Sequence, residues 1–337
     1  MKAIYVGKTE RELKDYPIPS PAAGEILIKN IAVSSNPKDW KLPIYIPGYA
    51  AVEGNDVAGH VESIGEGVTR FKVGDKVAAF TKMRSGDQYG AYAEYSVSPE
   101  GTAFHLGPKT SFEEASALPL AYMTAAIGLF KRLSLPLPGS SPTSPPTPVL
   151  IWGASGAVGA YATQLAKKAG LYVVGIAGSG SSIATSLGAD EVIDYRHKTM
   201  EELSLAISAA AGGKIKHAFD CISEGGTLES ITSALSRNGG GKYTYVLTYS
   251  DEELAAVPKN VQHERTLVAT AYGEDEKFAT EWFDKLGEWM EKGEFKSQKV
   301  TVLEGGLKGV EEGLRRLKEG EVRSEKFVYI VKDTPGL

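Results

Sequence analysis

An apolar run that leads into a glycine-rich turn is the segment of this sequence with the clearest chemical meaning. Residues 149–152 read VLIW, and residues 153–159 read GASGAVG before a helix-like stretch that extends to residue 170. Glycines allow a sharp turn and a close approach of the backbone to a pyrophosphate, and the first N–H groups of a helix attract an anion. Because strand, turn and helix follow in this order and further strand–helix repeats come after them, we predict a dinucleotide-binding site here.

The segment after the next apolar run, 172–177, indicates which dinucleotide is bound. A site for NAD carries an acidic side chain about 20 residues after the first glycine, where it accepts a hydrogen bond from the ribose. Residues 178–182 read GSGSS and contain no carboxylate. Hydroxyl and amide groups accommodate a 2′-phosphate that a carboxylate would repel, so we expect NADPH rather than NADH. The serines could instead cap the helix that follows, and both roles can coexist.

A third segment follows the strand-like residues 25–34, and residues 36–41 read NPKDWK. Pro37 fixes the local backbone, and Lys41 could point its ammonium group into a cleft. An arbitrary lysine is usually a solvated surface group, so these residue types alone assign no role to Lys41.

Residues able to hold a metal ion are few and scattered. Cys221 is the single cysteine, which excludes an internal disulfide and fits a reducing compartment. The five histidines include no pair with the i, i+4 spacing of a helical metal site. We therefore expect no metal in the catalytic site.

The elements that must position these segments change in style along the chain. Up to about residue 120 the sequence reads as short strands bounded by Gly, Pro or Asp. Residues 134–148 hold six prolines and no charge, which predicts an exposed loop. From residue 149 apolar strands alternate with amphipathic helices, which predicts an α/β fold with a parallel sheet covered on both faces. We expect strands at 25–34, 59–65, 76–80, 91–97, 149–152, 172–177, 191–195, 217–222, 242–247, 266–271, 299–303 and 326–331. We expect helices at 113–132, 157–170, 181–188, 199–211, 226–237, 276–293 and 309–320.

Length and composition agree with an enzyme of two domains. The 337 residues are 42% hydrophobic and 23% charged, as in globular α/β proteins. The net charge of −5 gives no electrostatic footprint for nucleic acid. No apolar run approaches the ~18 residues of a membrane span, and the first residues lack the features of a signal or transit peptide. We expect a cytoplasmic protein without a nucleic-acid or membrane partner.

Taken together, these motifs resemble the zinc-free branch of the medium-chain dehydrogenase/reductase superfamily, which includes quinone oxidoreductases and fungal trans-acting enoyl reductases. The resemblance extends over nearly the whole chain and is closest to the enoyl reductases in the last segment, GGLKGVEEGLRRLKEGEVRSEKFVYIV. It implies a GroES-like β domain over residues 1–120, completed by residues 294–337, and a Rossmann NADPH-binding domain with a doubly wound parallel sheet over 121–293.

The resemblance also implies roles for particular residues. Lys41 and Thr124 would lie near the reacting carbonyl, and Tyr45 occupies a loop where quinone-reductase relatives present a tyrosine, although Tyr49 competes for that position. The cofactor would be bound in three places, and Asn36 would lie beside the nicotinamide. The phosphate-binding turn would consist of Ser155, Gly156, Ala157 and Val158. The pocket for the 2′-phosphate would consist of Ser179, Ser181, Ser182 and Tyr195.

Some positions depart from the family pattern. Gly180 stands where many quinone reductases have a lysine, and Arg323 or Lys326 could supply the missing positive charge. Asn55 and Asp56 occupy the positions of the His-Glu pair of zinc-containing relatives. His60 is then expected to be an ordinary strand residue.

The implied activity is NADPH-dependent reduction of a carbon–carbon double bond conjugated to a carbonyl. Hydride would reach the β-carbon, and Lys41, Thr124 and a ribose hydroxyl would stabilise the resulting enolate. The α-carbon would take its proton from water or a tyrosine. The alternatives are an NADPH:quinone oxidoreductase and a non-catalytic, crystallin-like NADPH-binding protein. The small α,β-unsaturated substrate could be carried by a partner synthase, and the chain could be a monomer or a homodimer.

Overall fold

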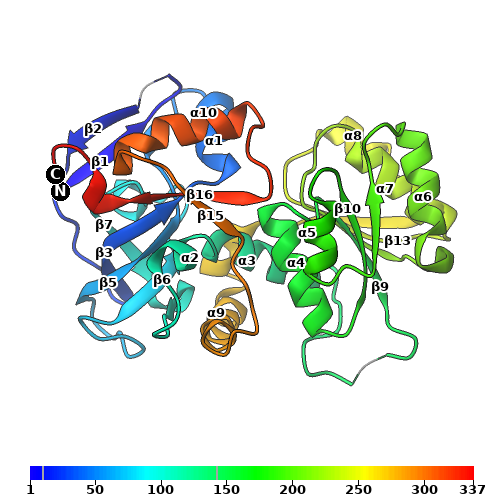
Figure 1. Ribbon diagram of the computed structural model, residues 1–337, viewed down its shortest axis with the longest axis horizontal. Coiled ribbons are helices and arrows are strands. Elements are labelled where there is room, and N and C mark those ends of the chain that lie inside the picture. The colour runs from blue at the N-terminus through cyan, green and yellow to red at the C-terminus, as the bar shows by residue number, and fades with distance from the viewer. Residues whose placement is uncertain (10, 142) are drawn as a thin grey trace. The chain divides into compact units, whose positions relative to one another are not determined.

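A computed structural model describes residues 1–9, 11–141 and 143–337. The chain forms two units (Figure 1), of which the first combines residues 1–123 with 269–337 and the second contains residues 124–268. In the described part of the chain, no helix has both the length and the apolar character that crossing a membrane requires.

The first unit is built mainly from β-strands. Strand β3 (Glu25–Ser34) lies at its centre and pairs antiparallel with β5 (Asp56–Ile64), β7 (Tyr95–Pro99) and β16 (Glu325–Ile330). The same sheet continues through β6 (Lys76–Phe80) to β8 (Ala103–His105) and, on the other side, to β15 (Lys299–Val302). A smaller sheet has the order β2 (Arg11–Asp15), β1 (Lys2–Val6), β4 (Ala51–Val52). Since β16 pairs with β3, the C-terminal segment completes the N-terminal domain.

Helices close the first unit around this sheet. They are α1 (Pro37–Tyr45), α2 (Phe112–Ser116), α9 (Glu276–Glu291) and α10 (Val310–Lys318). The apolar side of α10 contributes Val310 and Leu314 to a core that also holds Ile28 and Phe327. Short 3₁₀ turns complete the unit at Asp87–Tyr89, Glu100–Thr102, Val268–Tyr272, Gly306–Gly309 and Val331–Asp333.

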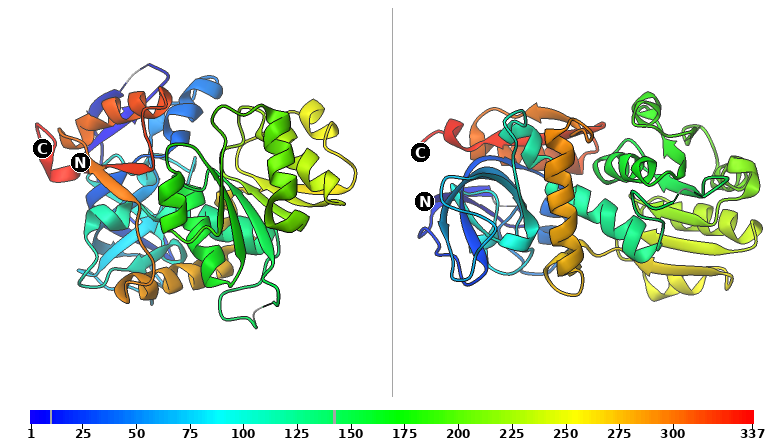
Figure 2. Two further views of the ribbon diagram at one scale, coloured as in Figure 1. Left: turned by 45° about the vertical axis from the view of Figure 1, so that its right-hand side comes forward. Right: turned by 90° about the horizontal axis from the view of Figure 1, so that it is seen from below.

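The second unit contains a six-stranded, entirely parallel sheet with helices on both faces (Figure 2). The strand order is β11–β10–β9–β12–β13–β14, which is the Rossmann order 3-2-1-4-5-6. The strands are β9 (Pro148–Trp152), β10 (Tyr172–Ala177), β11 (Glu191–Asp194), β12 (His217–Asp220), β13 (Gly241–Tyr245) and β14 (Val261–Arg265). The helices are α4 (Ala157–Lys168), α5 (Ser181–Ser186), α6 (Met200–Gly213), α7 (Thr227–Arg237) and α8 (Asp251–Ala255). The predicted fold class is therefore confirmed.

Several elements differ from the sequence prediction, and the strand expected at 91–97 is found at Tyr95–Pro99. The helix expected at 113–132 is interrupted: α2 ends at Ser116, α3 spans Pro119–Ala126, and a π-helix follows over Ile127–Arg132. Pro119 has no N–H to donate within a continuous helix, so a new helix starts there. The strand expected at 266–271 was also wrong, because the last strand is β14 at 261–265 and a 3₁₀ turn covers 268–272.

The division between the units also differs from the predicted boundary at residue 293. Helix α9 was expected in the Rossmann domain, but it belongs to the first unit. Its Phe283 stacks on Phe104 of β8, with ring centroids 5.9 Å apart, and the Tyr122 hydroxyl donates to the carbonyl of Trp282 at 2.9 Å. An amphipathic helix is compatible with either sheet, and these aromatic contacts decide which sheet α9 covers.

Residues 134–141 and 143–147, which the structure describes, contain no helix, and strand β9 begins at Pro148. Residues 139–141 and 143–146 are exposed, as expected of a surface loop, whereas Pro142 lies outside the described residues.

Candidate active site

The glycine-rich turn has the backbone geometry that close packing of strand and helix requires. Gly153 has a φ of 78°, and its N–H and that of Ala154 both donate to the carbonyl of Ile176 in β10. A Cβ on Gly159 would lie 2.1 Å from the carbonyl oxygen of Gly153, so only glycine fits there. The absence of a side chain at Gly159 therefore allows the turn and the helix to pack closely together.

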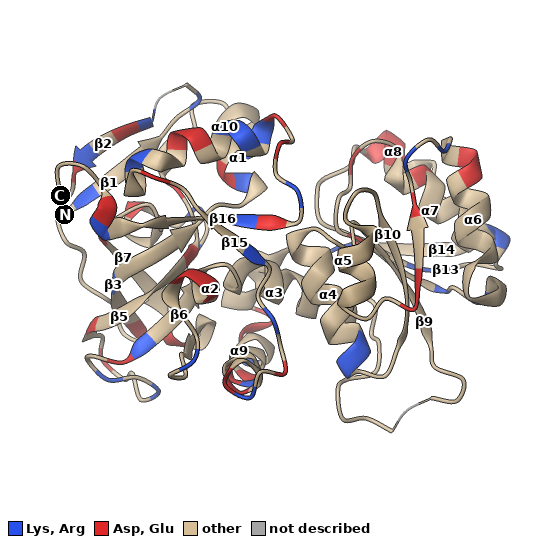
Figure 3. Ribbon diagram, viewed as in Figure 1, with Lys and Arg blue, Asp and Glu red and all other residues tan. Residues whose placement is uncertain are grey.

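The predicted phosphate-binding residues lie together at the start of α4. Ser155 and Gly156 end the turn, and Ala157 and Val158 are the first residues of the helix. The first N–H groups of a helix have no carbonyl partner one turn earlier, and they attract anions. Helix α4 carries charge only in its last turn and α5 carries none (Figure 3), so no nearby side chain of these helices opposes a phosphate at this end.

The residues predicted to hold a 2′-phosphate also come together, at the end of β10. A Cβ on Gly178 would lie 2.9 Å from the ring and hydroxyl of Tyr195, so the tyrosine packs directly on this turn. Ser179, Ser182 and Tyr195 are exposed, and the Ser181 hydroxyl donates to the Gly178 carbonyl at 2.7 Å. The N-cap of α5 is Gly180 and no side chain caps it. Since no serine side chain caps α5, the hydrogen bonds do not support the alternative that these serines serve only as helix caps.

Charged residues beside Tyr195 were missed by the sequence reasoning. Asp194 ends β11, and the guanidinium of Arg196 binds its carboxylate with Nη2 2.6 Å from Oδ2. These side-chain and backbone hydrogen bonds from Arg196 lower the pKa of Asp194 to about 2, so the carboxylate is ionised and paired. Lys198 is exposed in the same loop, and its N–H donates to the Tyr195 carbonyl. The signal was the basic run RHK that follows Tyr195 directly.

A buried carboxylate fixes the loop after β12, which borders the glycine turn. Asp220 is fully buried and accepts from the N–H groups of Ile222 and Ser223 and from three hydroxyls, at 2.5–3.2 Å. The hydroxyls belong to Thr227, Tyr243 and Tyr249. A Cβ on Gly153 would lie 2.8 Å from the side chain of Ile222. Asp220 therefore positions a wall of the candidate dinucleotide site.

In the first unit, the segment at 36–41 begins helix α1. Pro37 is the first helical residue, and the Asn36 N–H donates to Asp39 Oδ2 at 2.8 Å. Lys41 is half-buried, with its ammonium 5.4 Å from the ring centroid of Trp40. Tyr45 is 69% exposed, and its ring centroid lies 6.5 Å from that of Trp40. Lys41 and Tyr45 thus share one helix, whereas Thr124 is buried on α3 in the second unit.

Asn36, which the resemblance assigned to the cofactor, is held inside the first unit. Its Nδ2 donates to Asp56 Oδ2 at 2.7 Å, and Lys326 Nζ donates to its Oδ1 at 2.8 Å. Lys326 is only 4% exposed and also contacts Asp56, at 3.2 Å. Its charge is therefore balanced within the unit, which leaves Lys326 poorly suited to the role of a free cation for a 2′-phosphate. Contact between Asn36 and the cofactor stays a prediction.

A second buried network links α1 to the segment after it. Lys38 Nζ lies 2.7 Å from Asp39 Oδ1 and 2.6 Å from Glu53 Oε2, and the Tyr49 hydroxyl donates to Glu53. Although burial lowers the pKa of Lys38, the two carboxylates raise it by more. Burial and the Glu53 carboxylate raise the pKa of Tyr49, which makes Tyr49 a weak proton donor. Sequence reasoning noticed Tyr49 but not its partners.

Asn55 and Asp56, which the resemblance places at the His-Glu pair of zinc-containing relatives, both make hydrogen bonds within the first unit. Asn55 Nδ2 donates to the carbonyls of Thr81 and Lys82, both at 3.2 Å. Asp56 is fully buried and accepts from the Leu120 N–H at 2.7 Å besides its contacts with Asn36 and Lys326. Among the described residues, no three His, Cys, Asp or Glu side chains are gathered as a metal ion would require.

Comparison with known proteins identifies both halves. Residues 22–108 match the family model of the alcohol dehydrogenase GroES-like domain, and residues 157–289 match that of zinc-binding dehydrogenases. The trans-enoyl reductase fsr4 of Gibberella fujikuroi is 39% identical over 324 residues, which cover 92% of each chain.

Solved structures share the fold over nearly their full length. A putative zinc-dependent alcohol dehydrogenase from Rhizobium etli has a TM-score of 0.82 at 26% identity and covers 100% of this chain and 99% of its own. A mycobacterial protein complexed with NADPH has a TM-score of 0.77 at 22% identity, with 98% and 99% covered.

Two of these names mention zinc. Asn55 and Asp56, which the resemblance places where zinc-containing relatives have His and Glu, are an amide and a buried carboxylate that are both hydrogen-bonded here, and the absence of zinc stays a prediction. Two observations indicate the same protein family: the pairing of a GroES-like domain with a Rossmann domain, and the similarity over the whole chain. The chain belongs to the medium-chain dehydrogenase/reductase superfamily of oxidoreductases, among the relatives of fungal trans-enoyl reductases.

Proposed function

We propose that this protein uses NADPH to reduce a carbon–carbon double bond conjugated to a carbonyl. The observation that carries the proposal is the group of hydroxyls without a carboxylate at the end of β10, next to a glycine turn that admits a pyrophosphate. The similarity to a trans-enoyl reductase supports this choice of substrate class.

The residues present fit NADPH. The N–H groups at the start of α4 would hold the pyrophosphate, and Ser179, Ser182 and Tyr195 would surround the 2′-phosphate. Lys198 and Arg196 add positive charge beside Tyr195, although Arg196 is paired with Asp194. When bound, NADPH supplies a hydride, and the protein positions and polarises the substrate.

The side chains proposed to act on the substrate are Lys41, Thr124 and Tyr45. An enolate oxygen gains negative charge as the double bond is reduced, and an ammonium or hydroxyl aimed at that oxygen stabilises it. Lys41 on α1 and Thr124 on α3 would supply these groups. The α-carbon would take its proton from water or from Tyr45, whose exposed position leaves it accessible, while Tyr49 donates to Glu53.

The partner of the reaction follows from the substrate class. We propose a small α,β-unsaturated carbonyl compound, carried by a synthase where it is a thioester, with the enzyme in the cytoplasm. The oligomeric state is open between monomer and homodimer.

The deciding experiment measures NADPH oxidation with an enone, an enoyl thioester and a quinone side by side. Faster turnover of the enone or thioester than of the quinone supports the proposal. Preference for the quinone would make the protein a quinone oxidoreductase. Tight NADPH binding without turnover of any of the three would make it a non-catalytic binding protein.

A further inference from the structure

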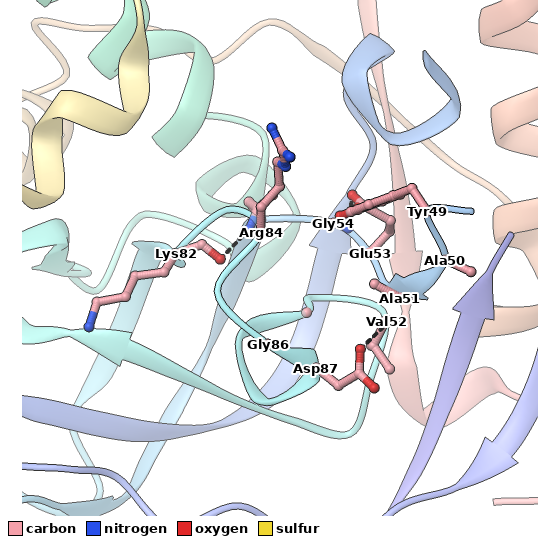
Figure 4. A pocket seen from close by; sticks show the side chains of 12 residues that line it. Tyr49, Ala50, Ala51, Val52, Glu53, Gly54, Lys82, Arg84, Gly86 and Asp87 are labelled. Carbon is pink, nitrogen blue, oxygen red and sulfur yellow. Dashed lines mark hydrogen bonds between the residues drawn. The ribbon is translucent and has the colours of Figure 1, made fainter. Parts of the chain in front are cut away.

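A pocket of about 220 Å³ lies within the first unit, outside the residues assigned above to catalysis (Figure 4). Two segments form its walls. One is residues 49–55, which follow α1 and include β4, and the other is residues 82–90, which follow β6. Five of the lining residues carry the argument: Tyr49, Glu53, Lys82, Arg84 and Asp87.

The walls are held by hydrogen bonds that do not depend on a ligand. The Val52 N–H donates to Asp87 Oδ1 at 3.0 Å, and the Ala91 N–H donates to the Gly54 carbonyl at 3.0 Å. Asn55 ties the Lys82 carbonyl to the same wall at 3.2 Å. Because both segments are joined at several points, the pocket is formed in advance of binding, as ligand sites usually are.

Most of the charges in these walls already have partners. Glu53 is paired with Lys38 and accepts from Tyr49, and Lys82 Nζ binds Glu25 Oε1 at 2.7 Å. Asp87 Oδ1 accepts from the Val52 backbone N–H, but no ion pair among the described residues neutralises the Asp87 carboxylate.

Arg84 differs from these residues. No hydrogen bond or ion pair joins its guanidinium to another residue in the described part of the chain, and its side chain extends from the loop away from Asp87 in Figure 4. Arg84 is exposed and, unlike Lys82, has no ion-pair partner among the described residues.

The backbone at Arg84 is unusual as well. Its φ is 55°, in the left-handed region that residues with a Cβ rarely adopt. Two residues later Gly86 has a φ of 124°, which a side chain would not allow. A strained residue held at the edge of a pocket suggests a binding role, because such conformations gather at ligand sites.

We propose that this pocket binds an anionic oxygen group of the substrate, a phosphate or a carboxylate, through the guanidinium of Arg84. This inference rests on the proposed function and names a part of the substrate beyond the reacting enone. Guanidinium groups bind such oxyanions with two parallel hydrogen bonds. Two sources of the anion are possible: the phosphate of a 4′-phosphopantetheine thioester, or a carboxylate on the substrate itself.

The test compares pairs of substrates that differ only in the anion. One pair is an enoyl 4′-phosphopantetheine and the same enoyl pantetheine, and the other is an enone with a terminal carboxylate and its methyl ester. Wild-type protein should prefer the charged member of one pair by about 10-fold or more in kcat/KM, through a lower KM. The pair that shows the preference identifies the source of the anion.

Variants at Arg84 and a matched control assign the effect. R84Q should abolish the preference while kcat stays near wild type, and R84K should retain part of it because an ammonium keeps the charge. K109Q removes one exposed positive charge from the same unit outside the pocket and should leave the preference unchanged. A wild type without any preference, or a preference that survives in R84Q, would overturn the inference.

Failure of the proposed function can be told apart from failure of this pocket. If no substrate is turned over, calorimetric titration with the saturated acyl 4′-phosphopantetheine and acyl pantetheine still measures the anion's contribution to binding. Tighter binding of the phosphate form that is lost in R84Q supports the pocket alone. Equal binding of both forms, together with equal binding of the carboxylate and ester, rejects it.

Discussion

Replacing Gly159 by alanine tests the geometry on which the dinucleotide site depends. The new Cβ would lie 2.1 Å from the Gly153 oxygen and 2.7 Å from its carbonyl carbon. Since these are backbone atoms, the turn and α4 must separate by about 1 Å to restore ordinary contact, and such overpacking costs about 1–3 kcal/mol. The same movement displaces the N–H groups proposed to hold the pyrophosphate. We expect the Tm to fall by several degrees and the Kd for NADPH to rise at least about 10-fold.

The neighbouring variant Gly156→Ala separates folding from binding. Gly156 has a φ of −76°, and a Cβ there would lie 3.3 Å from the Gly153 oxygen, which the structure tolerates with a small shift. We expect its Tm to stay near that of the wild type, while NADPH binding weakens if the pyrophosphate approaches this backbone closely. Differential scanning fluorimetry and calorimetric titration measure both quantities. If Gly159→Ala keeps the wild-type Tm and the wild-type Kd for NADPH, the dinucleotide site does not depend on close packing between the turn and α4.

Five further outcomes are expected. NADPH should bind more tightly than NADH by calorimetry, and Tyr195→Phe should weaken NADPH binding more than NADH binding; equal losses would remove the Tyr195 hydroxyl from the 2′-phosphate. Lys41→Ala should lower kcat by about 10- to 10³-fold with the Kd for NADPH nearly unchanged, and the reverse pattern would make Lys41 a cofactor ligand. Asp220→Asn should destabilise the protein by about 2–4 kcal/mol in urea unfolding, because five donors lose a buried carboxylate; a loss below 1 kcal/mol would contradict its anchoring role. Elemental analysis should find no stoichiometric zinc. One zinc per chain would contradict the prediction that Asn55 and Asp56 replace a zinc-binding His-Glu pair.

The Rossmann unit could be predicted from the sequence in some detail because its inner strands are apolar on both faces. Strands β9 and β10 begin and end within a residue of the runs 149–152 and 172–177. Edge strand β14 escaped prediction for the opposite reason: it reads VQHER, and only Val261 is buried. The apolar residues that follow it form a 3₁₀ turn, and hydrophobic periodicity does not distinguish such a turn from a short strand.

In the candidate site, contacts between neighbours in the sequence could be predicted, whereas contacts between distant residues could not. The phosphate-binding turn consists of neighbours in the sequence, so its residues could be named together. The contact between Lys326 and Asn36 joins residues 290 positions apart, and that between Lys38 and Glu53 depends on how the chain returns after α1. No spacing rule connects such residues, so the sequence alone does not predict these contacts.

These buried contacts give the residues of segment 36–41 different tasks. Asn36 joins Asp56 and Lys326, and the Asp39 carboxylate accepts from the Asn36 N–H and from the Tyr92 hydroxyl at 2.6 Å. Asn36 therefore ties the start of α1 to β5 and β16, and Asp39 ties it to the segment that precedes β7. Lys41 lies one turn beyond this anchor on the same helix and is half-buried. The rigid start of α1 thus limits where the Lys41 ammonium can move, and preorganised charge of this kind is what stabilisation of a developing oxyanion requires.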